Sequence, residues 1–181
     1  DGEDHRVWGC PVGHPTDFDT MIFSIKNRSS ENYLENVRCI VAVGEDYVDY
    51  TRELIAAHIV TDKPIDVIVG GHFRGDTLKK ALAYMEEQGI LDSVIVTHDA
   101  VRPFIDDRII DDNILAARGY GACNTCVPAV DTVLISEGGR FIDAVPPRST
   151  VFHAQTPQSF DAVKLFDLIK KTPPEVFKQM T

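Results

Sequence analysis

Two stretches of the sequence place polar and charged residues directly after apolar, β-branched runs. The first reads Gly70-Gly71-His72-Phe73-Arg74-Gly75-Asp76-Thr77 and follows the apolar run at 65–69. Glycines let a backbone approach a ligand closely, and the N-terminus of a helix favours anions. Arg74 adds a planar cationic group and Thr77 adds a hydroxyl. These features indicate an anion site, while a plain strand-to-helix turn with a surface arginine explains them equally well.

The second stretch reads Thr97-His98-Asp99-Ala100-Val101-Arg102-Pro103-Phe104 and follows the apolar run at 93–97. A His-Asp pair at a strand end can bind a metal or take part in acid–base chemistry. Arg102 stands where a phosphate could be held by two hydrogen bonds. For His98 we favour a structural interpretation, a buried His–Asp hydrogen bond that fixes the loop. For Asp99 and Arg102 a functional interpretation is favoured.

Further polar residues surround a predicted hairpin. Glu137-Gly138-Gly139 is a turn signal between two strand-like runs, at 131–136 and 140–145. This pattern predicts a β-arm over residues 130–155 that leaves the main sheet. Asp131 and Thr132 begin the arm, and Arg148 lies near its end. The following segment, residues 154–160, is dense in hydrogen-bonding side chains, and turn chemistry alone explains part of that composition.

The cysteines do not indicate a metal or disulfide framework. Cys123-x-x-Cys126 resembles half of a zinc site, but a second pair at suitable spacing is missing. On a strand the two thiols also point to opposite faces. With Cys10 and Cys39 the chain has four cysteines, too few and too scattered for a disulfide scaffold. A reducing cytoplasm is the expected location.

The elements that must position these residues alternate between strands and helices. Apolar runs without polar alternation are typical of strands buried on both faces. They fall at 37–43, 65–69, 93–97, 123–127 and 133–136. Helical patterns fall at 46–59, at 75 or 76 to 89, from 106 or 107 to about 117, and at 161–171. The alternation predicts βαβ units and an α/β fold, a Rossmann-like, mainly parallel sheet flanked by helices. The first 36 residues support no assignment.

The length and charge of the chain narrow its class. Its 181 residues fit a single domain, residues 1–181. The formal net charge of −10 disfavours nucleic-acid binding but leaves a free nucleotide possible. We expect no membrane partner, because no apolar run approaches the roughly 20 residues of a membrane span. No secretion leader is expected either.

Four motifs in register resemble one family, the methylerythritol-phosphate and ribitol-5-phosphate cytidylyltransferases. They are Gly70-Gly71-x-x-Arg74-x-x-Thr77, then Thr97 to Phe104 as quoted above, Asp131-Thr132, and Gln155-Thr156-Pro157-Gln158-Ser159-Phe160. Their order, their gaps and the hairpin between them match from about residue 37 to 181. The resemblance implies a nucleotide-diphospho-sugar transferase-like fold with a protruding β-hairpin arm.

Within the family, the resemblance is closer to the ribitol branch in the sequence of residues 96–104, 108–114, 120–122 and 155–160. The resemblance therefore favours an enzyme that joins CTP and D-ribitol 5-phosphate to give CDP-ribitol and pyrophosphate. The alternative is the 2-C-methyl-D-erythritol 4-phosphate cytidylyltransferase of isoprenoid synthesis. The two acceptor pockets need similar groups, so no residue separates the two decisively.

The resemblance also implies roles for individual residues. The residues implied to bind the nucleotide are Gly70, Gly71, Arg74, Thr77 and Ala100. The residues implied to bind the acceptor are Arg102, Asp131, Thr132, Arg148 and Thr156. Asp99 would lie near a Mg²⁺ ion that bridges the phosphates of CTP. Arg102 and Arg148 would carry the catalysis. Arg148 would hold the acceptor phosphate in the partner subunit's site, which makes the expected assembly a homodimer through the arm.

The chain departs from the family pattern near its start and after its end. The family opens with a strand, a glycine-rich loop and Pro-Lys-Gln-Phe, whereas Pro15-Thr16-Asp17-Phe18 has Thr16 in place of the lysine. The family also continues past the position of Thr181 with a second lysine. These departures indicate a truncated chain or a degenerate one. A degenerate chain would be a non-catalytic nucleotide-binding or dimerisation module.

Overall fold

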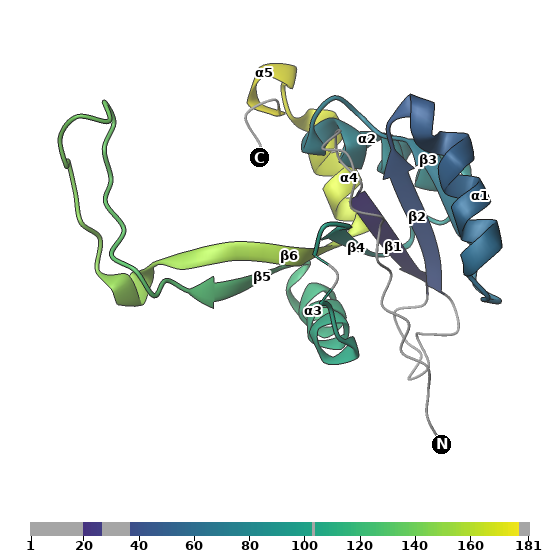
Figure 1. Cartoon of the computed structure of the whole chain (residues 1–181), viewed down its shortest axis with the longest axis horizontal. Helices are drawn as coiled ribbons and strands as arrows, with labels where there is room; N and C mark the ends of the chain where they lie inside the picture. The colour runs from purple at the N-terminus through teal and green to yellow at the C-terminus, as the bar shows by residue number, and fades with distance from the viewer. Residues whose placement is uncertain (1–19, 27–36, 103, 178–181) are drawn as a thin grey trace.

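The computed structural model describes residues 20–26, 37–102 and 104–177, which form a six-stranded sheet with helices on both faces (Figure 1). The strands are β1 (Thr20–Lys26), β2 (Val37–Val43), β3 (Ile65–Val69), β4 (Ser93–Asp99), β5 (Ala122–Pro128) and β6 (Phe152–Asp161). Their order across the sheet is β3-β2-β1-β4-β6-β5. The α/β fold predicted from the sequence is confirmed.

The strand directions follow from the pairing. β2 and β3 are parallel, whereas β1 is antiparallel to both β2 and β4, and β6 is antiparallel to both β4 and β5. Among the described strands, β2, β3, β4 and β5 therefore point the same way, with β1 and β6 against them. The carboxyl ends of β3 and β4 consequently meet at one edge of the sheet.

The helices cover the two faces separately. They are α1 (Val48–His58), α2 (Arg74–Glu87), α3 (Asp107–Tyr120), α4 (Ala162–Lys171) and the short α5 (Pro174–Phe177), with 3-10 turns at Glu45–Tyr47 and Arg148–Thr150. α2 and α4 contact each other and pack on one face, and α3 packs on the other face against β4, β5 and β6. α1 lies against the edge strand β3.

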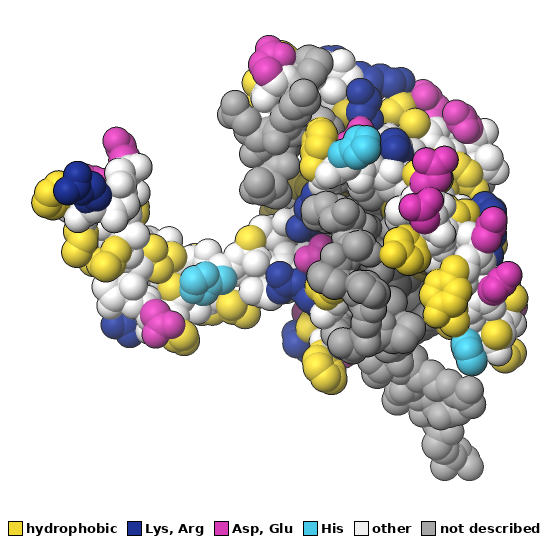
Figure 2. All heavy atoms as spheres, turned by 45° about the horizontal axis from the view of Figure 1, so that its top comes forward, with side chains coloured by type: hydrophobic (Ala, Val, Ile, Leu, Met, Phe, Trp, Pro, Cys, Tyr) yellow, Lys and Arg dark blue, Asp and Glu magenta, His cyan; other side chains and the backbone are white. Residues whose placement is uncertain are grey.

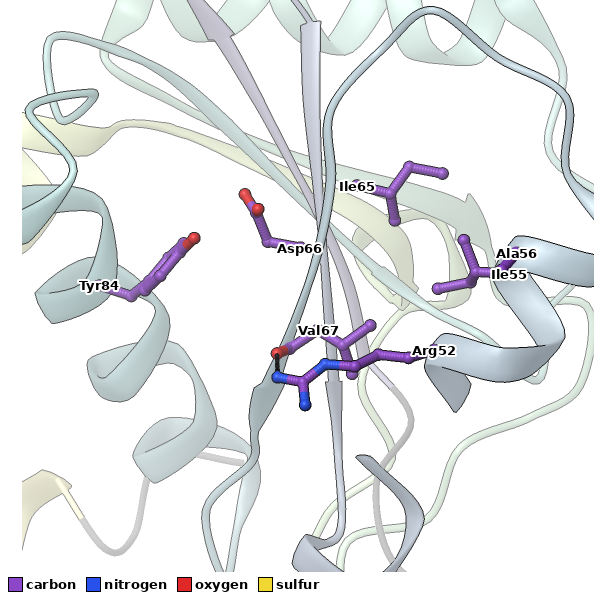
Figure 3. A pocket seen from close by; sticks show the side chains of 7 residues that line it. All are labelled: Arg52, Ile55, Ala56, Ile65, Asp66, Val67 and Tyr84. Atoms are coloured by element: carbon purple, nitrogen blue, oxygen red, sulfur yellow. Dashed lines mark hydrogen bonds between the residues drawn. The ribbon is translucent and has the colours of Figure 1, made fainter. Parts of the chain in front are cut away.

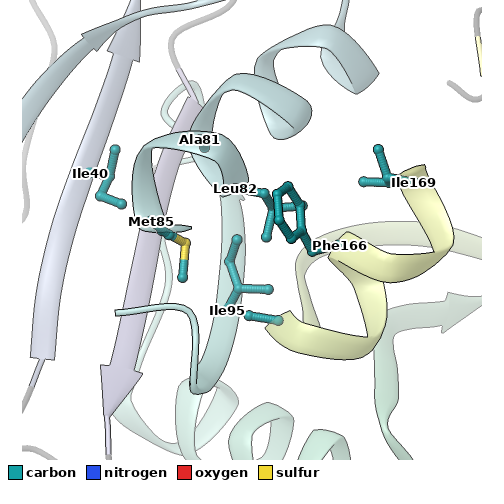
Figure 4. Close-up of a cluster of buried hydrophobic side chains, with 8 residues drawn as sticks. Ile40, Ala81, Leu82, Met85, Ile95, Phe166 and Ile169 are labelled. Atoms are coloured by element: carbon teal, nitrogen blue, oxygen red, sulfur yellow. The ribbon is translucent and has the colours of Figure 1, made fainter. Parts of the chain in front are cut away.

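The larger core lies between the sheet and the helices α2 and α4. Ile40 of β2 and Ile95 of β4 pack against Leu82 and Met85 of α2 and against Phe166 of α4 (Figure 4). All of these side chains are buried. Each contributes roughly 1.5–3 kcal/mol through removal of its apolar surface from water. This core fixes α2, and with α2 the loop that precedes it.

Strand alternation places the neighbouring residues of β4 on the opposite face. Val94 and Val96 are buried against Ile114 and Ala117 of α3, which recur with helical spacing. The predicted cap of this helix is confirmed, since Asp106 Oδ1 accepts a hydrogen bond from the Ile109 N–H at 2.8 Å. Ile95, Thr97 and Asp99 alternate with these residues and so face α2.

The start of α2 differs from the sequence-based prediction. The helix begins at Arg74, with Phe73 at the N-cap position, rather than after Gly75 or Asp76. Phe73 has no side-chain acceptor for the first N–H groups of the helix. The Asp76 carboxylate instead accepts a hydrogen bond from the His72 N–H at 3.2 Å. The loop after β3 is therefore folded back onto the first turn of α2.

Residues 129–151 form a protrusion beyond the ends of β5 and β6 (Figure 1). The two strands predicted within it are not formed, because 131–136 and 140–145 share a single bridge between Ile135 and Ala144. Conversely, residues 154–160 belong to β6, which the sequence analysis assigned to no strand. The protrusion is thus carried by β5 and β6 rather than by a separate hairpin.

Several features of the sequence fall outside the described residues. They are Cys10, Thr16 and its neighbours at 15–18, and Pro103. β1 lies in the first 36 residues, where the sequence patterns supported no assignment. Within the described ranges, no helix is both long and apolar enough to cross a membrane.

Candidate active site

The loop after β3 is shaped by hydrogen bonds from its own backbone. The Gly70 N–H donates to the Val43 carbonyl oxygen at 2.7 Å, and the Gly71 N–H donates to Thr77 Oγ1 at 2.9 Å. Thr77 is 1% exposed. Its hydroxyl therefore braces the loop from inside. Lys80 donates to the Gly70 carbonyl oxygen at 2.7 Å and holds the loop from α2.

The position of Gly71 has no room for a side chain. A Cβ atom at this position would lie 2.4 Å from Asp76 Oδ2 and 2.6 Å from the Asp76 backbone carbon. The backbone atom cannot move aside without displacing the first turn of α2. Gly70 has more room, with its nearest neighbour, the Val43 carbonyl oxygen, at 3.4 Å from an added Cβ. The loop thus runs close to the start of the helix, where backbone N–H groups favour an anion.

The loop after β4 is a tight turn that begins at Asp99. The Arg102 N–H donates to the Asp99 carbonyl oxygen at 3.0 Å, with Ala100 and Val101 between them. His98 is buried and its Nε2 donates to the Arg102 carbonyl oxygen at 2.8 Å. The structural interpretation of His98 therefore agrees with the fold, but its partner is the backbone of Arg102 and not Asp99.

Two arginines from different strand ends converge on the Asp99 carboxylate. Arg102 Nε donates to Asp99 Oδ2 at 3.1 Å, and Arg74 Nη1 lies 3.6 Å from Asp99 Oδ1. The three side chains are 43%, 33% and 24% exposed, in the order Arg102, Arg74 and Asp99. Two guanidinium groups and one carboxylate leave a net positive charge that faces solvent. Such a cluster can bind phosphate groups.

Strand β6 supplies a neutral acceptor to each arginine. Arg74 Nη2 donates to Gln158 Oε1 at 2.9 Å, and Arg102 Nη1 donates to Gln155 Oε1. Gln158 Nε2 in turn donates to Asn124 Oδ1 of β5 at 3.3 Å. The sequence analysis quoted both glutamines in a motif and gave them no role. Their spacing did not indicate a shared site, because residues three apart point to opposite faces of a regular strand.

Thr156, expected to bind the acceptor, lies beneath the same cluster. It is 9% exposed, and its Oγ1 accepts a hydrogen bond from the Asp99 N–H at 3.4 Å. Thr97 donates to the Gln158 carbonyl oxygen at 3.1 Å. These contacts join β4 and β6 where the two strands diverge. Thr156 thus contacts the backbone that positions Asp99.

The remaining predicted residues lie on the protrusion. Asp131, Thr132 and Arg148 are exposed. Within the described part of the chain the Arg148 guanidinium forms no hydrogen bond or ion pair. Phe152 stands three residues before Gln155, the partner of Arg102, which corresponds to about 10 Å of extended strand, and Arg148 lies a further four residues away on the protrusion. The fold therefore does not bring Arg148 to the arginine pair of its own chain.

The protrusion also exposes many apolar side chains, which Figure 2 shows along its length. These residues are Val130, Leu134, Ile135, Phe141, Ile142, Val145 and Phe152, each between 47% and 79% exposed. Exposed apolar side chains gathered on one segment are typical of interaction sites.

Asp99 supplies the carboxylate of the arginine cluster, and this carboxylate is the group there that could contact a Mg²⁺ ion. Mg²⁺ in nucleotide sites is held by one or two carboxylates together with substrate phosphates. Asp99 Oδ1 lies beyond hydrogen-bond distance from Arg74, so the donor set fits an ion brought by a nucleotide. Among the described residues no group of three His, Cys, Asp or Glu side chains could hold a metal by itself.

A separate pocket of about 410 Å³ lies at the edge strand β3, away from the arginine cluster (Figure 3). Arg52, Ile55 and Ala56 of α1 line one side, and Tyr84 of α2 lines the other, with residues 65–67 between them. Arg52 Nη2 donates to the Val67 carbonyl oxygen at 3.4 Å.

An ion pair between Arg38 and Asp66 lies next to this pocket and influences two neighbouring side chains, Tyr84 and Cys39. Arg38 Nη1 lies 2.6 Å from Asp66 Oδ2, and this hydrogen bond raises the pKa of Arg38. Burial, followed by the Asp66 charge, raises the pKa of Tyr84 and also raises the pKa of the Cys39 thiol to about 12. We interpret the Arg38–Asp66 ion pair as structural. It does not include Arg74, Arg102 or Asp99.

Comparisons with known proteins agree on one family. The sequence profile of the 2-C-methyl-D-erythritol 4-phosphate cytidylyltransferase family matches residues 21–178. A 4-diphosphocytidyl-2C-methyl-D-erythritol synthase from Anaerococcus prevotii is 27% identical, with a TM-score of 0.64 over 73% of this chain and 56% of that chain. The chain therefore spans little more than half the length of this relative.

Two further structures share the fold. A second 4-diphosphocytidyl-2C-methyl-D-erythritol synthase is 24% identical, with a TM-score of 0.60 over 78% of this chain and 67% of that chain. A 2-C-methyl-D-erythritol 4-phosphate cytidylyltransferase from Thermus thermophilus is 22% identical, with a TM-score of 0.53 over 73% of this chain and 57% of that chain. The matching family profile favours the methylerythritol alternative of the sequence analysis. The preference for the ribitol branch receives no specific support.

Proposed function

The chain belongs to the 2-C-methyl-D-erythritol 4-phosphate cytidylyltransferase family, and on this basis we propose that it transfers the cytidylyl group of CTP to a phosphorylated polyol. In the proposed reaction an oxygen of the acceptor phosphate attacks the α-phosphorus of CTP. The bond between the α-phosphorus and the bridging oxygen breaks, and pyrophosphate leaves.

The observation that carries this proposal is the convergence of Arg74 and Arg102 on Asp99. The reaction brings together two phosphorylated anions, whose mutual repulsion opposes the attack. Fixed guanidinium groups offset this repulsion and neutralise charge on the reacting phosphates. No covalent intermediate on the protein is required. Positioning and charge neutralisation supply the catalysis.

The nucleotide would bind along the loop after β3. Gly70 and Gly71 bring the backbone close to the base and ribose, and Thr77 holds the loop in place through the Gly71 N–H. Arg74 contributes its guanidinium, and Ala100 contributes backbone from the neighbouring turn. The site lies beyond the carboxyl ends of the strands, where ligands of α/β sheets bind.

Asp99 would supply the protein carboxylate to a Mg²⁺ ion that accompanies CTP. When bound, the ion contributes neutralisation of the triphosphate charge. Asp99 also orients the two arginines, because each approaches a different oxygen of its carboxylate.

We propose that the protrusion at residues 129–151, with the adjoining start of β6, pairs two copies of the chain. Its exposed apolar side chains need a partner, and Arg148 lies too far along the arm to reach the arginine pair of its own chain. In a homodimer Arg148 would enter the site of the partner and hold the acceptor phosphate with Arg102. Asp131 and Thr132, on the same arm, would line the acceptor pocket.

The acceptor that we propose is 2-C-methyl-D-erythritol 4-phosphate, with D-ribitol 5-phosphate as the competing substrate. The test is pyrophosphate release by the full chain with CTP and Mg²⁺, with each acceptor in turn. Turnover with the methylerythritol phosphate, and less with the ribitol phosphate, is expected. The opposite order would overturn the acceptor assignment. Binding of CTP without turnover would identify a non-catalytic nucleotide-binding module.

A further inference from the structure

We infer that Gln155 and Gln158 are positioning residues that hold Arg102 and Arg74 through neutral acceptors, so that the cluster keeps a net positive charge for phosphate groups. The inference rests on the proposed function and names two residues that the family resemblance left without a role. It concerns how the anion site obtains both fixed geometry and net positive charge.

Each arginine beside Asp99 also contacts one glutamine of β6. Arg74 donates to Gln158 on one side, and Arg102 donates to Gln155 on the other. Arg102 therefore has two hydrogen-bond acceptors, one oxygen of Asp99 and the amide oxygen of Gln155, whereas Arg74 has a hydrogen bond to Gln158 and a longer ion-pair contact with Asp99. Two separate contacts fix the plane of a guanidinium group, which a single contact would leave free to rotate.

The orientation of one amide is itself fixed. Gln158 Nε2 donates to Asn124 Oδ1 of β5 at 3.3 Å, so Gln158 Oε1 must face Arg74. The Gln158 carbonyl oxygen also accepts from Thr97 Oγ1 at 3.1 Å, which fastens its backbone to β4. A chain of contacts thus runs from β5 through β6 to the first residue of α2.

The choice of amides over carboxylates decides the charge of the cluster. Arg74 and Arg102 contribute two positive charges and Asp99 contributes one negative charge, so the cluster carries a net charge of about +1 with glutamines present. A glutamate at position 155 or 158 would accept the same hydrogen bond more strongly. It would also cancel the remaining positive charge. Neutral acceptors therefore hold the arginines without weakening their attraction for anions.

A purely structural role for the glutamines predicts a different order of variants. If they only hold β6 in place, glutamate keeps the acceptor and should be milder than alanine. If neutrality matters, glutamate should be worse than alanine for anion binding while it leaves the fold at least as stable. Gln155 gives the cleaner comparison, because the described contacts of its side chain are with Arg102 alone.

The experiment compares Gln155→Glu, Gln155→Ala and Gln88→Glu with the parent chain. Gln88 is an exposed residue just after α2, and its substitution makes the same charge change at the far end of the helix from Arg74. Isothermal titration calorimetry measures binding of inorganic tripolyphosphate and of CTP. Thermal unfolding measures the stability of each variant. Titrations at low and high salt separate the electrostatic contribution.

We expect Gln155→Glu to weaken tripolyphosphate binding about tenfold, Gln155→Ala less, and Gln88→Glu hardly at all. The Gln155→Glu defect should shrink as salt is raised, with no loss of thermal stability. At position 158 we expect the same order, with a larger loss of tripolyphosphate affinity in Gln158→Glu than in Gln158→Ala. The inference is overturned if Gln155→Glu binds tripolyphosphate as tightly as the parent, or if Gln155→Ala loses more affinity than Gln155→Glu. The proposed function would stand in either case. A parent chain that binds neither anion overturns both.

Discussion

Arg74 Nη1 lies 3.6 Å from Asp99 Oδ1, so the first residue of α2 meets the last residue of β4. β3 and β4 are not neighbours in the sheet, since β2 and β1 stand between them. The loop after β3 leads across the sheet before α2 begins, since its Gly70 N–H donates to the Val43 carbonyl oxygen at the end of β2. Partly exposed pairs of this kind add little to stability. The value of the contact is therefore in the position that it gives the guanidinium.

Replacement of Arg74 should affect ligand binding more than folding. Arg74→Ala removes a charge-assisted hydrogen bond donor from the proposed nucleotide site, and we expect CTP affinity to fall by roughly 1–3 kcal/mol. Calorimetry with CTP and Mg²⁺ measures the change. Arg108→Ala is the matched control, because Arg108 forms an exposed ion pair with Asp112 on α3. Equal CTP affinity in the Arg74→Ala variant and the parent would contradict the assignment.

The helices of this fold could be predicted from local patterns. Ile114 and Ala117 follow helical spacing, and Asp106 caps the same helix as expected. β6 could not be predicted in this way, since Gln155 to Gln158 combines a proline with polar residues and resembles a turn. Its strand conformation comes from pairing with β4 and β5, which are distant in the sequence.

The site could be predicted only where its residues are close in sequence. Asp99 and Arg102 are three residues apart in one turn, and their association follows from the motif. Gln155 and Gln158 reach the arginines because β6 inserts between β4 and β5, a placement that no local pattern encodes. The position of Arg148 depends on a protrusion whose predicted strands are not formed.

Gly71 offers a test of the loop geometry. Gly71→Ala should destabilise the fold by about 1–3 kcal/mol and weaken CTP binding, because its Cβ would collide with the backbone of Asp76. Gly119→Ala is the control: Gly119 lies in α3 with open space around it, and alanine there should stabilise the helix by about 0.5–1 kcal/mol. Chemical denaturation measures both. A Gly71→Ala chain as stable as the parent would show that the loop is more pliable than its contacts indicate.

Cys39 should make the fold sensitive to alkaline pH. Burial, and to a smaller degree Asp66, raises the pKa of this thiol from 9.0 to about 12. Below pH 9 the thiol is protonated in the folded and unfolded states and adds no pH dependence. Above pH 9 the unfolded chain releases the proton that the folded chain retains, so stability falls as pH rises toward 12.

The expected size of this loss is about 1 kcal/mol between pH 9 and pH 10. Urea denaturation of the parent and of Cys39→Ala at both pH values isolates it from other titrating groups. The variant should be less stable at pH 8 because a cavity is left, but it should lose less stability as pH rises. Cys126→Ala, at an exposed position, is the control. Identical alkaline slopes in the parent and Cys39→Ala would rule out the shift.

Arg148 lies on the protrusion, four residues before the start of β6. If it holds the acceptor phosphate in the partner's site, Arg148→Ala should reduce turnover with the polyol phosphate and leave CTP affinity nearly unchanged. Arg148→Lys should restore activity only in part, because an ammonium group cannot form the two parallel hydrogen bonds of a guanidinium. Steady-state kinetics with each substrate varied in turn separates the two effects.

Mixed dimers decide which subunit Arg148 serves. In a dimer of one Arg148→Ala chain and one Arg74→Ala chain, one site would lack both arginines and the other would have both. Pyrophosphate release should therefore recover in the mixture, although each variant alone is nearly inactive. Two Arg148→Ala chains with distinguishable tags, mixed in the same way, are the control. Light scattering should first show a mass near twice 20.1 kDa for the parent. If the parent chain is active and the mixed dimer forms, but pyrophosphate release does not recover, Arg148 acts in the site of its own chain or in none.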